Sequence, residues 1–137
     1  MNTAVIYATK SGHSKKIADA IAKELDTTAL DIKENPNIDS IDLLYIVGGI
    51  YGGQSSPELL NYIRSLDNTM VKETVLITSC VSKKIRQEEA RRILIEKKIA
   101  VREDEFVCQG SFLFFGIKHP NAADINDAVS FAKNQAL

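Results

Sequence analysis

The sequence predicts an α/β fold, a three-layer α/β/α sandwich around a five-stranded parallel sheet. One observation is that short apolar runs alternate with amphipathic runs, the rhythm of parallel strands joined by right-handed helical crossovers. Another is that the apolar runs are continuous, as expected for strands covered on both faces. The 137 residues, of which 45% are hydrophobic, predict a single domain spanning residues 1–137.

Each expected strand is a short run rich in aliphatic and aromatic residues. The strands are Thr3–Tyr7, Ala29–Ile32, Leu43–Val47, Thr74–Ser79 and a stretch within Glu105–Gly116 whose most apolar part is Phe112–Phe115. Between the second and third strands, Lys33–Asp42 contains Asn35-Pro36-Asn37 and is expected to be a loop with room for a helical turn.

The expected helices place their apolar residues on one face. The first, Ser14–Leu25, buries Ile17, Ala18, Ile21, Ala22 and Leu25. The second follows the start signal Ser55-Ser56-Pro57-Glu58 and extends to about Leu66. The third, Arg86–Ile99, buries Ala90, Ile93, Leu94 and Ile99, and the last, Pro120–Gln135, buries Ile125, Ala128, Val129 and Ala132.

Composition narrows the classes of function. The formal net charge of −1 argues against a nucleic-acid-binding protein. No apolar stretch approaches the ~20 residues of a membrane helix, so no membrane insertion is expected. Cys80 and Cys108 are too few for a disulfide scaffold, and without an export signal they favour the cytoplasm. We predict no metal site, and no Ser/His/Asp order or close acid pair marks a catalytic residue.

The first polar segment follows the strand Thr3–Tyr7 and opens a helix. Its three hydroxyls, one glycine and backbone amides lie where the helix dipole favours an anion, and a lysine adds positive charge. The segment therefore predicts a phosphate site, with a capped helix after a tight turn as the alternative. Its residues are Thr9, Lys10, Ser11, Gly12, His13 and Ser14.

The second segment, Gly48–Gly53, holds four glycines around an Ile-Tyr pair. Glycine lets the backbone approach a ligand closely, and a tyrosine beside a phosphate site can stack on a flat ring. The alternative is a flexible turn with a surface tyrosine. The candidate binding residues are Gly49, Ile50, Tyr51, Gly52 and Gly53.

The third segment ends the strand Thr74–Ser79 at the same edge of the sheet. Its hydroxyls and amides are suited to the polar edge of a ring, and its cysteine is more readily explained as a small buried residue than as a reactive thiol. The candidate binding residues are Thr78, Ser79, Cys80 and Val81, followed by Ser82.

Together these segments resemble the flavodoxin family of FMN-binding proteins. Val5–Ser14 followed by Ala18 is similar to the family's N-terminal signature, with Ser14 where threonine is usual. Gly48–Gly53 resembles the family's flavin loop in the form Gly-x-Ile-Tyr-x-Gly. His119-Pro120-Asn121 and the residues after it are similar to the last helix of small bacterial members.

This resemblance implies the strand order 2-1-3-4-5 and the short-chain form of the fold. It implies an FMN cofactor whose phosphate lies in Thr9–Ser14, whose ring lies between Tyr51 and Thr78–Ser82, and whose N5 atom faces the backbone at Gly52. The implied function is to carry electrons between redox partner proteins.

Two alternatives remain open at this point. One is a small FMN-dependent oxidoreductase, of the quinone-dependent protoporphyrinogen oxidase or NAD(P)H-linked reductase type. The other is a cofactor-free regulatory domain of the same fold, which is less favoured because the first strand ends in Tyr7-Ala8-Thr9 without the acids that a receiver needs.

The segment Lys83–Arg102 carries eight basic residues against three acids. It is a candidate docking surface for an acidic redox partner, with a solvated helix face as the alternative. The basic residues are Lys83, Lys84, Arg86, Arg91, Arg92, Lys97, Lys98 and Arg102.

Overall fold

The computed structural model describes residues 1–10, 12–51, 54–80, 87–109 and 122–136. Its strands are β1 (Thr3–Tyr7), β2 (Ala29–Asp31), β3 (Ile41–Tyr51), β4 (Gln54–Ser55), β5 (Val71–Cys80), β6 (Ala100–Val101) and β7 (Phe106–Gln109). Its helices are α1 (His13–Glu24), α2 (Pro57–Arg64), α3 (Glu88–Glu96) and α4 (Ala122–Gln135), and a 3₁₀ turn, η1, spans Ile32–Glu34.

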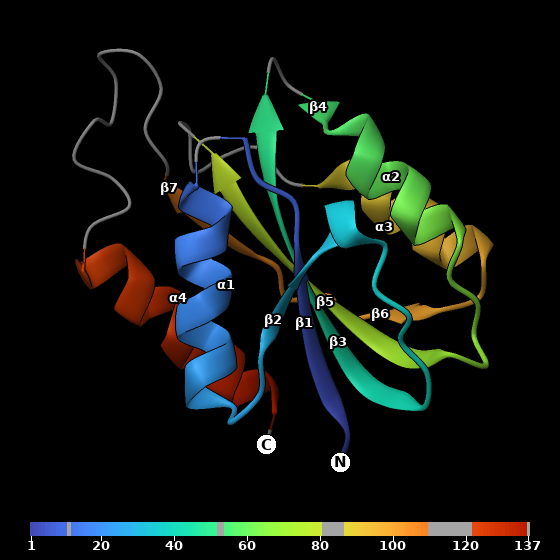
Figure 1. Ribbon diagram of the computed structural model, residues 1–137, viewed down its shortest axis with the longest axis horizontal. Helices are drawn as coiled ribbons and strands as arrows, with labels where there is room; N and C mark the ends of the chain where they lie inside the picture. The colour runs from blue at the N-terminus through green and yellow to red at the C-terminus, as the bar shows by residue number, and fades with distance from the viewer. Residues whose placement is uncertain (11, 52–53, 81–86, 110–121, 137) are drawn as a thin grey trace.

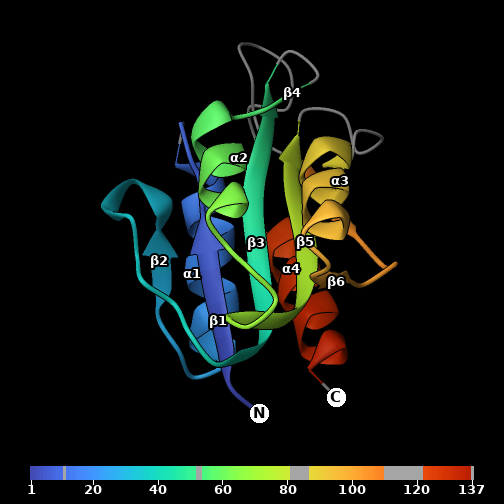
Figure 2. The ribbon, with the colours of Figure 1, turned by 90° about the vertical axis from the view of Figure 1, so that its right-hand side faces the viewer.

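The sheet has the order β2-β1-β3-β5 (Figure 2), and a fifth position is shared by the two short strands β6 and β7. Both β6 and β7 pair in parallel with β5, β6 near its beginning and β7 near its end. The register is uninterrupted across the centre, where Val5 pairs with Tyr45 and Val47 pairs with Ile77. The predicted order 2-1-3-4-5 is therefore confirmed, with the last strand divided into two.

Helices cover both faces of the sheet, as the continuous apolar strands predict. Helices α1 and α4 lie against one face, and α2 and α3 lie against the other (Figure 1). Because successive side chains of a strand point to opposite faces, β1 sends Val5 into the core under α1 and Ile6 into the core under α2. The three-layer sandwich is confirmed.

Helix α3 ends earlier than the sequence predicts. Lys98 adopts a left-handed backbone with φ of 62°, and the Ile99 amide donates to the Leu94 carbonyl over 3.0 Å. This closing turn carries Ile99 into the core, where it is 1% exposed although it lies outside the helix. The periodicity therefore identified Ile99 as a core residue but not as a helical one.

Helix α4 also departs from the prediction in detail. Ala128 and Ala132 are buried as expected, whereas Ile125 and Val129 are only half-buried. The small alanines allow α4 to pack closely against α1 and the sheet. The predicted strand core Phe112–Phe115 lies outside the described residues.

Tyr45 ties α4 to the centre of the sheet. Its side chain is fully buried in β3, and its hydroxyl donates to the Ala132 carbonyl over 2.7 Å. Burial raises the pKa of Tyr45 from 10.0 to about 12, because the phenolate is poorly solvated there.

We expect the free energy of unfolding to fall as the pH rises from 10 to 12. A phenol with a raised folded pKa contributes stability that is complete below the unfolded pKa of 10.0 and is lost on approaching the folded value of about 12. Urea unfolding at successive pH values checks this. Tyr45→Phe should fall less steeply across that window, and equal slopes for the two proteins would contradict the assignment.

Candidate functional site

The three polar segments lie at one edge of the sheet, because β1, β3 and β5 are neighbours and run in parallel. The Ala8 amide donates to the Val47 carbonyl over 3.0 Å, which holds the first segment beside the second. Gly48 is in register with Thr78, and Gly49 with Ser79, which holds the second beside the third. Ligands of open α/β sheets bind at this carboxyl edge.

The first segment forms an open helix N-terminus. Gly12 is the N-cap of α1 with φ of 88°, a left-handed conformation that glycine adopts without a Cβ penalty. The Thr9 hydroxyl accepts a hydrogen bond from the Gly12 amide over 2.8 Å, which closes the turn. Since glycine has no side chain to cap the helix, the N-terminus of α1 can face an anion, which its dipole favours. Ser11, in the same segment, lies outside the described residues.

The hydroxyl oxygen of Ser14 is a buried polar atom at the start of α1. Its residue is 1% exposed, and its hydroxyl has no hydrogen-bond partner among the described residues. Burying a hydroxyl without a partner is unfavourable by about 1–3 kcal/mol, so such a group needs an explanation. A hydroxyl in the first turn of α1, at a helix N-terminus whose N-cap is a glycine, is suited to donate a hydrogen bond to a phosphate oxygen.

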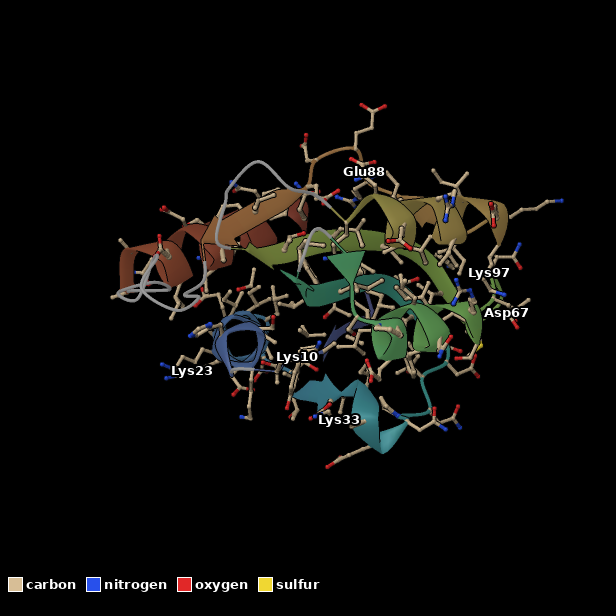
Figure 3. All side chains as sticks on the ribbon, turned by 90° about the horizontal axis from the view of Figure 1, so that it is seen from above. Lys10, Lys23, Lys33, Asp67, Glu88 and Lys97 are labelled. Carbon is tan, nitrogen blue, oxygen red and sulfur yellow. The ribbon has the colours of Figure 1, made fainter. Side chains whose placement is uncertain are left out.

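His13 and Lys10 differ in the charge that they bring to this segment. Burial, reinforced by the positive charge of Lys16, lowers the pKa of His13. The imidazole is therefore a neutral hydrogen-bonding group at pH 7 rather than a cation. Lys10 lines the neighbouring pocket, and Figure 3, which looks onto this edge of the sheet, shows it close to α1.

A pocket of about 140 Å³ lies at this edge. It brings together three of the predicted residues, Thr9, Lys10 and Gly49. The other lining residues are Ala8, Ile32, Lys33, Ser56 and Glu58, which the sequence analysis did not single out as binding residues. Only the strand order could have indicated Ile32 and Lys33, because it places the end of β2 next to the end of β1.

The second segment is not a loop at its start, which corrects the prediction. Gly48, Gly49, Ile50 and Tyr51 continue β3, and this extension pairs with β4 as an antiparallel hairpin. Ile50 is buried in it at 7% exposure. The Tyr51 side chain and the predicted residues Gly52 and Gly53 lie outside the described part of the chain.

Gly48 is a glycine for a steric reason. Among the described glycines only Gly12 has a positive φ, so Gly48 is not there to permit a left-handed turn. A Cβ at position 48 would lie 2.6 Å from Leu59 Cδ2 and 3.3 Å from Gln87 Oε1. Glycine therefore lets α2 and the start of α3 approach the end of β3.

The third segment begins within β5, as expected from the predicted strand Thr74–Ser79, and the strand extends one residue further, to Cys80. Thr78 is fully buried and Ser79 is 6% exposed. The Thr78 hydroxyl donates to Glu105 Oε2 over 3.4 Å, so it takes part in a buried network. The Cys80 side chain, Val81 and Ser82 lie outside the described residues.

The basic segment is less available for docking than its composition indicates. Arg91 pairs with Glu105 over 3.0 Å, and Arg102 pairs with Glu73 over 3.0 Å, so both cations serve the fold. Arg92 and Lys98 are exposed. Lys83, Lys84 and Arg86 fall in residues 81–86, outside the described chain.

Other classes of site are not seen in the part of the chain that the structure describes. There, no group of three or more His, Cys, Asp or Glu residues is placed to hold a metal ion. None of the described helices is long and apolar enough to cross a membrane.

The comparison with protein families decides the assignment. A family model described as "Flavodoxin domain" matches residues 4–111. The chain belongs to this family. Among curated proteins, no significant match to this flavodoxin-domain protein is found.

Solved structures agree with the fold of this flavodoxin-domain protein. Oxidised flavodoxin 1 from Bacillus cereus has a TM-score of 0.71 at 18% identity, covering 99% of this chain and 97% of its own. The WrbA-like flavodoxin from Agrobacterium tumefaciens has a TM-score of 0.72 at 14% identity, covering 97% and 93%. The Fusobacterium nucleatum flavodoxin bound to flavin mononucleotide has a TM-score of 0.68 at 17% identity, covering 98% of both chains.

Proposed function

We propose that this flavodoxin-domain protein binds FMN at the carboxyl edge of β1, β3 and β5 and carries electrons between redox partner proteins. The observation that carries the proposal is the buried Ser14 hydroxyl at the N-terminus of α1, which has no hydrogen-bond partner among the described residues. Membership of the family and the similarity to an FMN-bound flavodoxin support it.

The chain's own residues would hold the cofactor at two ends. The first-turn amides of α1 and the Ser14 hydroxyl would bind the phosphate, with Lys10 adding positive charge. The ring would lie over the ends of β3 and β5, between Tyr51 and Thr78–Ser82. Bound FMN supplies the redox chemistry, while the protein orients it and sets its potential.

The phosphate group should dominate the affinity. We expect FMN to bind at least about 100-fold more tightly than riboflavin, which lacks the phosphate, because hydrogen bonds to a charged group contribute about 1.5–3 kcal/mol each. Titration calorimetry of the apo-protein with both ligands measures the ratio. Similar dissociation constants for the two would contradict a phosphate site at Thr9–Ser14.

An FMN-dependent oxidoreductase is the second candidate function. Among the described residues that line the pocket, the two lysines Lys10 and Lys33 outnumber the one acid, Glu58, which favours an anionic electron donor such as a nicotinamide dinucleotide. An electron carrier should show no sustained turnover with NADH, NADPH or a quinone. Steady-state turnover with one of them would favour the oxidoreductase instead.

A further inference from the structure

Glu105 lies in a buried network next to the proposed flavin site. It precedes β7, and its side chain is fully buried. Its Oε1 accepts a hydrogen bond from Arg91 Nη2 over 3.0 Å, and its Oε2 accepts the Gln87 amide over 2.8 Å and the Thr78 hydroxyl over 3.4 Å. With three donors, this buried carboxylate has most of its hydrogen-bonding capacity occupied by the protein itself.

The donors to Glu105 come from two different elements, β5 and the start of α3. Thr78 lies near the end of β5, and Gln87 is the N-cap of α3 but makes no side-chain cap of its own. Glu105 therefore binds the amide of the N-cap residue of α3 from just before β7, and its negative charge also suits the helix dipole. One carboxylate thus contacts both β5, which ends at Cys80, and Gln87, the first described residue after residues 81–86.

Gln87 extends the network to the second candidate segment. Its side chain is fully buried, and its Nε2 donates to the Ile77 carbonyl over 2.9 Å. Its Oε1 lies 3.3 Å from where a Cβ of Gly48 would be. The start of α3 is therefore packed against the ends of both β3 and β5, the two strands between which the ring of FMN would lie.

We propose that Glu105 is a positioning residue for the flavin site: it fixes the end of β5 against the start of α3, and so sets the affinity and the potential of bound FMN. This inference rests on the proposed function. Because its side chain is fully buried, Glu105 would act through its hydrogen bonds to Thr78 and Gln87, which hold these two residues at a fixed separation.

Glu105→Gln tests the proposal, with Glu73→Gln as the matched control. Glu73 also pairs with an arginine, but near the opposite end of β5 and with its side chain 45% exposed. In Glu105→Gln we expect the dissociation constant of FMN to rise about tenfold, which corresponds to ~1.4 kcal/mol. The potential of FMN in the saturated protein should become less negative, because Arg91 loses its counter-charge. Glu73→Gln should change neither.

A readout in the apo-protein tests the anchoring without FMN. Hydrogen exchange of the Gln87 and Arg91 amides should accelerate in Glu105→Gln, while the Leu60 amide in the first turn of α2 should not change. If Glu105→Gln does not fold, Glu105→Asp, which keeps the charge on a shorter side chain, should give smaller changes in the same direction in amide exchange and in FMN affinity.

The outcomes separate the two proposals. A variant that melts earlier but keeps the affinity and the potential of the wild-type protein would overturn the positioning role, leaving Glu105 a structural residue. Unchanged exchange at Gln87 would overturn it as well. A wild-type protein that binds no FMN would overturn the proposed function and the effect on flavin, while the exchange data would still decide whether Glu105 anchors α3.

Discussion

Replacing Ser14 with alanine is expected to weaken FMN binding by about 10- to 100-fold without destabilising the apo-protein. The two effects differ because the hydroxyl is buried without a partner among the described residues. Removing it from the apo-protein removes no contact that the structure describes. Removing it from the complex deletes a hydrogen bond to a dianionic phosphate, which contributes about 1.5–3 kcal/mol.

Fluorescence titration of FMN and urea unfolding of the apo-protein measure these two effects separately. Ser65→Ala is a suitable control, because the Ser65 hydroxyl donates to the Tyr62 carbonyl at the far end of α2. It should reduce stability slightly and leave FMN affinity unchanged. Equal affinity of Ser14→Ala and the wild-type protein would place the phosphate elsewhere.

Replacing Gly48 with alanine is expected to destabilise the protein by about 1–3 kcal/mol through overpacking. The new Cβ would lie 2.6 Å from Leu59 Cδ2, and the fully buried Leu59 has little room to move. In a Leu59→Val background, which lacks that carbon, the same substitution should be milder. Urea unfolding of the two single variants and the double variant gives the coupling directly.

Gly12→Ala is the informative comparison for this cycle. A Cβ at position 12 would meet nothing within 4 Å, so its effect of about 1–2 kcal/mol comes from the left-handed backbone alone. Leu59→Val should not relieve it. Additive effects of Gly48→Ala and Leu59→Val would contradict a steric role for Gly48.

The fold could be predicted because its signals are local. Thr3–Tyr7 appears as a strand from five residues alone, and Ser56 and Pro57 start α2 where a hydroxyl cap followed by proline predicts a helix. The extension of β3 through Gly48 could not be predicted in this way. Glycine is uncommon in strands. Position 48 requires a glycine because Leu59 of α2 and Gln87 at the start of α3 approach it closely.

In the site, too, the residues that are contiguous in the sequence could be predicted, and those that come together only in the fold could not. Thr9–Ser14 is contiguous in the sequence, so its hydroxyls and glycine could be recognised together as a helix N-terminus. Glu105 carried no such signal, because a single acid near a strand usually lies on the surface. Its burial depends on Thr78, Gln87 and Arg91, which come together only in the folded sheet.

The most direct test of the central claim is the visible absorbance spectrum of the purified wild-type protein, recorded after incubation with FMN and desalting. We expect the flavin absorption bands to stay with the protein, and Ser14→Ala to retain less flavin under the same conditions. A wild-type protein that emerges colourless would contradict FMN binding, and the open turn at Gly12 would then be only the start of a helix.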